Sequence, residues 1–278
     1  MISTYRFSHL INPRHLFANL WKHREMLAEL IRRDISQQYQ GSFLGIAWSV
    51  LAPLSTLLVY TFVFSVVFKA RWQGQAETPP GEFAVVLYAG MTAFSVFSTL
   101  ATRAPGLVLG VPNYVKKVVF PIEIMPVMAL GSALFTSLIN IVLIILMNLV
   151  LLHSFSASII FLPLAYLPLI FLSLGTGWFL ASLGVYIRDM GQGVNIIVQM
   201  LFFLSPIFYP IEAVPPAFQG ILRINPLTMI VAGFRQTLIW NLHLPWLDWA
   251  LTTLVTFIFA ILGYVWFMKT KNGFADVL

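Results

Sequence analysis

Long uncharged runs alternate with short basic segments along this 278-residue chain. About 20 apolar residues cross a bilayer as a helix, and a charge at the helix centre costs roughly 2.5–3.5 kcal/mol. The 64 uncharged residues from Ile124 to Ile187 are too many for one span, and "LLHSFSAS" around His153 interrupts them with polar side chains. The pattern predicts six membrane spans, at about 41–68, 83–102, 127–151, 159–187, 190–211 and 249–268.

The composition agrees with a membrane protein. Hydrophobic residues make up 59% of the chain and charged residues 9%, and the mean hydropathy is +0.87. A soluble domain carries about 25% charged residues, so these charges are too few to cover a surface that faces water. We expect an all-α integral membrane protein in which residues 1–278 form one transmembrane domain. Its parts are a cytoplasmic interfacial segment at 1–41, the bundle at 42–268 and a cytoplasmic tail at 269–278.

The segment before the first span has apolar residues at nearly helical spacing. They are Leu16, Leu20, Leu27, Ile31 and Ile35, and basic residues accompany them. This pattern is typical of an N-terminal amphipathic helix that lies in the membrane interface with its apolar side down. A solvated charged arm that only sets the topology is the alternative.

Between the last two spans, residues 209–246 contain five prolines together with Glu212, Arg223 and Arg235. The apolar pieces between these breaks are too short to span. We expect a re-entrant pair of helices, at about 214–223 and 227–241, that enters from the outer face, because irregular backbone at membrane depth is tolerated only against protein or water. The residues predicted to form an outer, periplasmic gate are Glu212, Arg223, Asn225, Pro226 and Arg235. The alternative is a surface loop on the headgroups.

The basic residues orient the spans. With both termini in the cytoplasm, 12 of the 16 Lys and Arg residues lie inside, which is the bias expected of a multi-span protein in the bacterial inner membrane. The net charge of +6 therefore reflects topology, and we expect no nucleic-acid partner.

Several kinds of chemistry are missing from the sequence. It has no cysteine, no G-x-x-x-x-G-K-[ST] phosphate loop, no H-E-x-x-H motif and no Asp or Glu inside the six predicted spans. Asp34, Glu123 and Asp189 are far apart in the sequence, which argues against the alternative of a membrane-embedded glycosyl- or acyl-transferase. We expect no catalytic residue, metal site or bound cofactor in this chain, and a separate chain that hydrolyses ATP.

Four stretches, in order along the chain, resemble the ABC-2-type permeases that export polysaccharides, the group of the O-antigen, capsule and teichoic-acid exporters. They are "RRDISQQYQGSFLGIAWSVLAPLSTLLVYTFVFSVVFKARW" (32–72), "PNYVKKVVFPIEIMP" (112–126), "RDMGQGVNIIVQMLFFLSPIFYP" (188–210) and "INPLTMIVAGFRQ" (224–236). Together they cover about a third of the chain. Ile122 departs from the pattern, since many relatives carry a basic residue there.

The resemblance implies that the cytoplasmic loop after the second span forms a short coupling helix on an ATPase subunit. Pro112 and Pro121 bracket eight residues, enough for two turns, and proline can start a helix and end one. The predicted coupling residues are Asn113, Tyr114, Val115, Lys116, Lys117, Val118, Val119, Phe120, Glu123, Arg188 and Asp189. The alternative for the two lysines is a role in topology alone.

The resemblance also implies the partners and the cargo. We expect a homodimer of this chain with two copies of an ABC ATPase, which binds ATP and Mg, and export of a lipid-linked polysaccharide, O-antigen in the first place, from cytoplasm to periplasm. Teichoic acid, a drug or a glycolipid are alternative cargoes. Aromatic rings can stack on sugars, and the candidates for a pore lining are Trp48, Tyr60, Phe202, Phe203, Phe208 and Tyr209. Aromatic residues also face lipid and form interfacial belts, which is the alternative for each of them.

Overall fold

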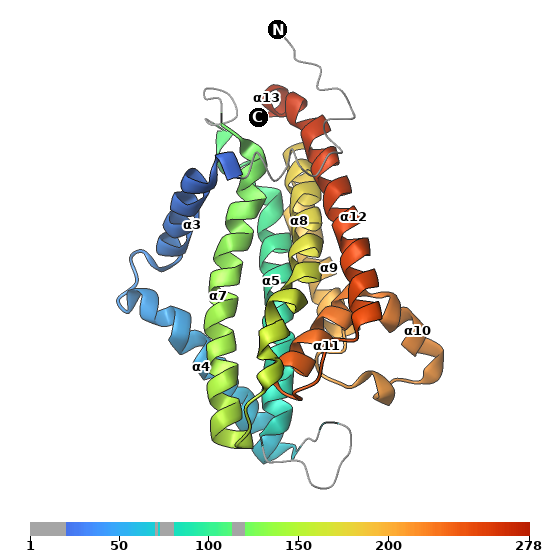
Figure 1. Ribbon diagram of the computed structural model, residues 1–278. Helices are drawn as coiled ribbons and strands as arrows, with labels where there is room; N and C mark the ends of the chain where they lie inside the picture. The colour runs from blue at the N-terminus through green and yellow to red at the C-terminus, as the bar shows by residue number, and fades with distance from the viewer. Residues whose placement is uncertain (1–20, 70–71, 73–80, 113–119) are drawn as a thin grey trace.

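The computed structural model describes residues 21–69, 72, 81–112 and 120–278, and all regular elements in these ranges are helical (Figure 1). Five helical segments are long and apolar enough to cross a membrane. They run over Gly45–Val67, Glu82–Leu107, Ile122–Leu152, Ala157–Tyr186 and Trp246–Val277. The predicted all-α membrane fold is confirmed, and these five segments match five of the six predicted spans.

Helix α5 (Glu82–Leu107) is the centre of the bundle. Of its most apolar 18 residues 78% are buried, against 6% in the first span, which is α4 (Trp48–Tyr60) and its π-helical continuation Thr61–Val67. Helices α7 (Met125–Met147), α8 (Leu162–Tyr186), α9 (Met190–Leu204) and α11 (Pro226–Leu238) all pack against α5. The first span is therefore at the edge of the bundle, with apolar side chains exposed.

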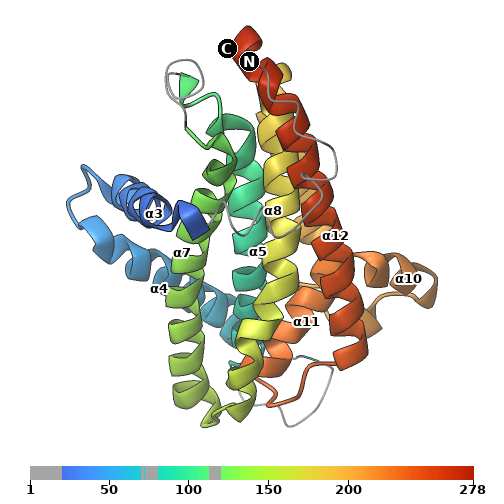
Figure 2. The ribbon, with the colours of Figure 1, turned by 45° about the horizontal axis from the view of Figure 1, so that its top comes forward.

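Glycines let the helices approach closely. Helix α12 (Trp246–Thr270) runs alongside α8 (Figure 2), and a Cβ at Gly263 would collide with the backbone of Gly175. A Cβ at Gly184 of α8 would likewise collide with the backbone of Pro105 in α5. Small residues at such crossings let backbones pack directly, which is a main source of helix association in membranes.

Hydrogen bonds between helix ends define two ends of the bundle. At one end, Tyr186 donates to the carbonyl of Thr270, and Lys271 pairs with Glu123 at 2.6 Å. This end also carries the C-terminal α13 (Phe274–Val277). At the opposite end, Asn148 donates to the carbonyl of Leu238. Residues whose chain positions differ by more than 80 thus fix the up-and-down order of the spans.

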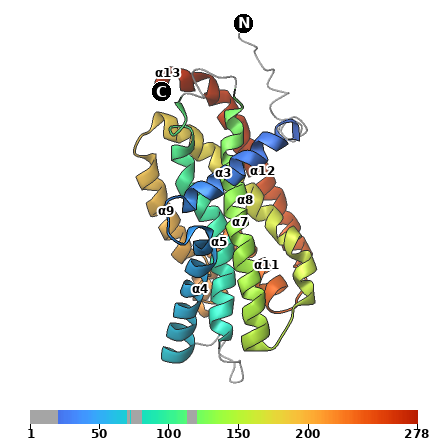
Figure 3. The same cartoon turned by 90° about the vertical axis from the view of Figure 1, so that its left-hand side faces the viewer.

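The N-terminal helix α3 (Arg24–Tyr39) lies across α7 (Figure 3). A Cβ at Gly131 of α7 would overlap the Ile31 side chain, so the absence of a side chain at Gly131 leaves room for Ile31 to pack against α7. Part of the predicted amphipathic segment, including Leu16 and Leu20, lies outside the described residues. Its place in the membrane interface stays a prediction.

The fifth predicted span is shorter than the sequence indicated. Helix α9 ends at Leu204 instead of Ile211, and its 15 residues reach about 22 Å at 1.5 Å per residue, less than the ~30 Å hydrocarbon core. The reason is local: Ser205 precedes Pro206 and is extended, with φ −97° and ψ 142°, as a residue before proline prefers.

The predicted pair of short helices is present as α10 (Pro216–Ile224) and α11, bent by 88°. The bend falls at Asn225, whose side chain accepts a hydrogen bond from the Leu227 amide (3.0 Å) and so caps α11. Pro226 occupies the first helical position, where its missing N–H is no loss. If the pair counts as one span, the described part of the chain has six candidate spans.

Candidate translocation groove and coupling end

One face of α5 carries a row of hydroxyl groups. Thr92, Ser95, Ser98, Thr99 and Thr102 recur at three- and four-residue spacing, which places them on one side of a helix. They open on two adjoining hollows of about 410 and 390 Å³, both of which Met91 and Ser95 line. We call these two hollows the hydroxyl groove.

The polar groups that line the hydroxyl groove are uncharged, and most of the surrounding lining surface is apolar. Helices α4 and α7 contribute Thr56, Thr136 and Asn140, and α9 contributes Asn195 and Gln199. The hydroxyls of Thr92, Ser95, Ser98 and Thr102 donate to carbonyls of their own helix, as Ser95 does to the Thr92 carbonyl at 2.8 Å, so their oxygen lone pairs remain available as acceptors. The arrangement suits a neutral ligand rich in hydroxyl groups.

The groove brings together two of the six aromatic candidates. Trp48 lines the first hollow and Phe202 the second. The rings of Phe203 and Phe208 pack on Phe202 at 5.6 and 5.0 Å. The Tyr209 hydroxyl donates to the carbonyl of Phe203 (3.0 Å).

The sixth aromatic candidate, Tyr60, packs on Phe64 at 6.0 Å.

Sequence reasoning missed the hydroxyl row itself, whose signal was the helical spacing of serine and threonine inside an apolar span.

The groove is open on one side of the chain. Helices α4 and α9 lie on the same side of α5 (Figure 3), and each exposes apolar residues, such as Val59 in α4 and Ile197 and Met200 in α9. One chain therefore supplies a groove and not a closed pore.

At the end that carries α13, the predicted coupling residues are only partly described. Positions 113–119 lie outside the described residues. Glu123 is 5% exposed, its carboxylate binds Lys271, and its carbonyl accepts from the Trp178 indole at 2.9 Å. Arg188 and Asp189 are exposed in the turn between α8 and α9. Glu123 thus joins the end of the coupling segment to Lys271, the first residue after α12, and to Trp178 of α8, while Arg188 and Asp189 are accessible.

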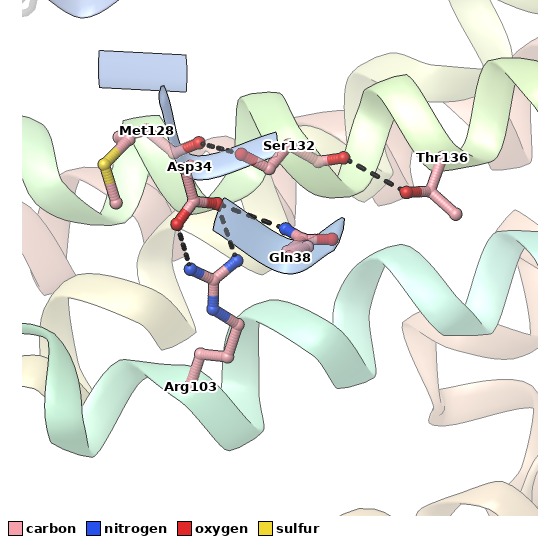
Figure 4. A network of polar contacts seen from close by, with 6 residues as sticks. All are labelled: Asp34, Gln38, Arg103, Met128, Ser132 and Thr136. Atoms are coloured by element: carbon pink, nitrogen blue, oxygen red, sulfur yellow. Dashed lines mark hydrogen bonds and ion pairs between the residues drawn. The ribbon is translucent and has the colours of Figure 1, made fainter. Parts of the chain in front are cut away.

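A second ion pair at this end was not predicted. The Arg103 guanidinium of α5 donates to both carboxylate oxygens of Asp34 in α3, at 2.6 and 3.0 Å, and Gln38 adds a third bond at 3.3 Å (Figure 4). Burial acts to raise the pKa of Asp34. Hydrogen bonds from Arg103, Ser132 and Gln38 and the charge of Arg103 outweigh it and hold the pKa below its ordinary value.

The predicted gate residues do not form one cluster. Glu212 and Arg223 are exposed, and the Asn225 amide donates to the Ser205 hydroxyl at 3.1 Å. Arg235 is only 3% exposed and donates to the carbonyls of Val86, Pro206 and Ile207. Its guanidinium also lies over the Trp72 ring, at 4.3 Å from the centroid.

Comparison with known proteins defines the class. The family model described as ABC-2 type transporter matches residues 26–239, most of the chain. The chain therefore belongs to the ABC-2 type transporter family, which confirms the resemblance seen in the sequence. Membership makes it a multi-span membrane protein and implies an ABC ATPase as a partner.

Curated relatives match most of the chain. It is 24% identical over 255 residues to the O-antigen export system permease protein RfbA of Klebsiella pneumoniae, covering 91% of this chain and 95% of the relative. The protein of the same name from Myxococcus xanthus is 26% identical over 236 residues, 83% and 86% of the two chains. The polysialic acid transport protein KpsM of Escherichia coli is 26% identical over 210 residues, 74% and 78%.

Proposed function

We propose that this chain is the transmembrane permease subunit of an ABC exporter that moves a lipid-linked polysaccharide, O-antigen in the first place, across the bacterial inner membrane. The names of the relatives support this cargo class. The observation that carries the proposal is the uncharged, hydroxyl-lined groove along α5.

The groove fits a polymer that must bind weakly and move. Sugar hydroxyls can exchange water for the oxygens of Ser95, Thr99, Asn195 and Gln199 without paying to desolvate a charge. Trp48 offers an aromatic face near one hollow. No Asp, Glu, Lys or Arg is among the described residues that line either hollow, so no charge there would hold the polymer in one register.

A homodimer would complete the path. Helices α4 and α9 each line one hollow of the groove and expose apolar side chains, and a second copy facing them would enclose a channel. Two ATPase subunits would then dock at the end that carries α13, which we assign to the cytoplasm, with both termini, on the basis of the positive-inside bias. Residues 113–120, Arg188 and Asp189 would contact the ATPase, which binds ATP and Mg, and this chain would hold no cofactor. The outer gate would be α10 and α11.

Deleting the chain in its host tests this function. Loss of an exporter leaves complete lipid-linked polysaccharide inside the cell and none on the surface. Loss of a glycosyl- or acyl-transferase leaves an incomplete polymer. Normal surface polysaccharide in the deletion strain would show that the cargo is something else, and teichoic acid, a drug or a glycolipid would then be the alternative cargoes.

A further inference from the structure

A cavity of about 440 Å³ lies at the end opposite α13, between the start of α5, residues 206–212 and α11. Its lining includes Trp72, Glu82, Glu212, Arg235, Gln236 and Trp240. None of its lining residues belongs to the hydroxyl groove. We call it the outer cavity. Its volume lies within the ~300–1,000 Å³ of typical ligand pockets.

The walls of the outer cavity offer hydrogen-bond acceptors. The Oε1 atom of Gln236 is buried and has no hydrogen-bond partner in the part of the chain that the structure describes. A buried carbonyl without a partner is costly, so a donor is expected to satisfy it. The carboxylates of Glu82 and Glu212 add further acceptors.

Arg235 is the one cation among the described residues that line the cavity, and it is already engaged. Each of the three nitrogens of Arg235 donates to a backbone carbonyl, at 3.1, 2.8 and 2.7 Å, and the guanidinium covers the Trp72 ring. Two carboxylates beside an occupied guanidinium disfavour an anion. A purely apolar ligand would leave Gln236 unsatisfied. The ligand should therefore carry several donors and no negative charge.

We infer that the outer cavity is a glycosyl-binding subsite, which holds a neutral sugar unit of the polymer as it leaves the path. Sugar hydroxyls can donate to the unpartnered Oε1 atom of Gln236, to Glu212 and to Glu82, whose carboxyl already has a hydrogen bond with Trp240. The sugar's C–H face can pack on the Trp240 ring. This inference rests on the proposed function. The outer cavity would be a second contact site for the polymer, in addition to the hydroxyl groove. It lies beside the turn at Pro206 and Ile207, whose carbonyls accept hydrogen bonds from Arg235.

The test uses the chain purified with its ATPase partner in lipid nanodiscs. The probes are oligosaccharides released by mild acid from the polysaccharide that the host strain displays, and binding is followed by saturation-transfer NMR. We expect saturable binding that Gln236→Leu weakens about 5- to 10-fold, the effect of one lost hydrogen bond to a buried acceptor. Gln37→Leu, at an exposed position of α3, is the matched control and should bind as wild type.

A second measurement avoids a change inside the cavity wall. The chain has no cysteine, so Glu212→Cys places a single thiol at the exposed rim. The oligosaccharides should slow its reaction with a charged thiol reagent several-fold. Absence of binding together with unchanged labelling, or displacement of the oligosaccharides by inorganic phosphate, would overturn the inference.

The two failures can be told apart. If the deletion strain loses surface polysaccharide but the purified complex binds no oligosaccharide, the subsite is wrong and the exporter stands. If surface polysaccharide persists without the chain, the proposed function itself is wrong.

Discussion

Asp34 and Arg103 lie 69 residues apart and are joined by two hydrogen bonds of 2.6 and 3.0 Å (Figure 4). The pair fastens α3 to α5, one residue beyond Thr102 in the hydroxyl row. The N-terminal helix is thus attached directly to the helix that lines the groove.

Neutralising this pair should weaken the bundle. Asp34→Asn leaves Arg103 without its charge partner, and because the two side chains are 12% and 31% exposed we expect a loss of about 1–2 kcal/mol. Thermal unfolding of the purified chain measures it. Glu29→Gln, an exposed change on the same helix, is the control.

The same pair predicts a pH dependence. The folded-state pKa of Asp34 lies below its ordinary value of 3.8, so the stabilisation is fully present above that value and is lost as the pH falls through the lower folded-state pKa. The free energy of unfolding of the wild type should therefore approach that of Asp34→Asn in acid. A constant difference between the two at all pH values would contradict this.

The close packing of α8 and α12 predicts that only glycine is tolerated at position 263. Gly263→Ala would push a methyl group into the Gly175 backbone, which cannot move aside as a side chain can. Overpacking of this kind costs about 1–3 kcal/mol. Gly220→Ala on α10, where nothing lies within 4 Å, should be neutral or stabilising.

The coupling segment can be tested by charge reversal. Lys116→Glu with Lys117→Glu should reduce co-purification of the ATPase and uncouple hydrolysis from export. Arg32→Glu with Arg33→Glu, exposed on α3, carries the same change in charge and should keep the complex. A correctly inserted coupling variant with normal complex yield and normal export would exclude docking through these lysines.

The outer gate predicts a labelling pattern. Single cysteines from 217 to 240 should react with an impermeant reagent from the periplasm with helical periodicity, interrupted at the bend between α10 and α11. Adding the ATPase with ATP should change the pattern if these helices move. Uniform labelling would indicate a surface loop, and labelling only from the cytoplasm would reverse the topology.

Sequence reasoning succeeded where one local rule dominates. Hydropathy placed five spans, and the prolines between residues 209 and 246 correctly divided that segment into two short helices, the first of which begins at Pro216 instead of at about residue 214. Hydropathy alone extended the fifth span to residue 211, but α9 ends at Leu204 because Ser205, which precedes Pro206, is extended. Sequence reasoning could not find the Asp34–Arg103 and Glu123–Lys271 pairs or the burial of Arg235, because each depends on contacts between distant segments.

The central claim is that polysaccharide passes along the hydroxyl groove. A photo-crosslinking amino acid at Thr99 or Gln199 should capture the polymer in cells whose exporter is halted during transport, since both side chains line the groove. The same group at Val255, an exposed position on α12, should capture lipid and no polymer. Polymer captured equally at Val255, or none at Thr99 and Gln199 while export proceeds, would contradict the account.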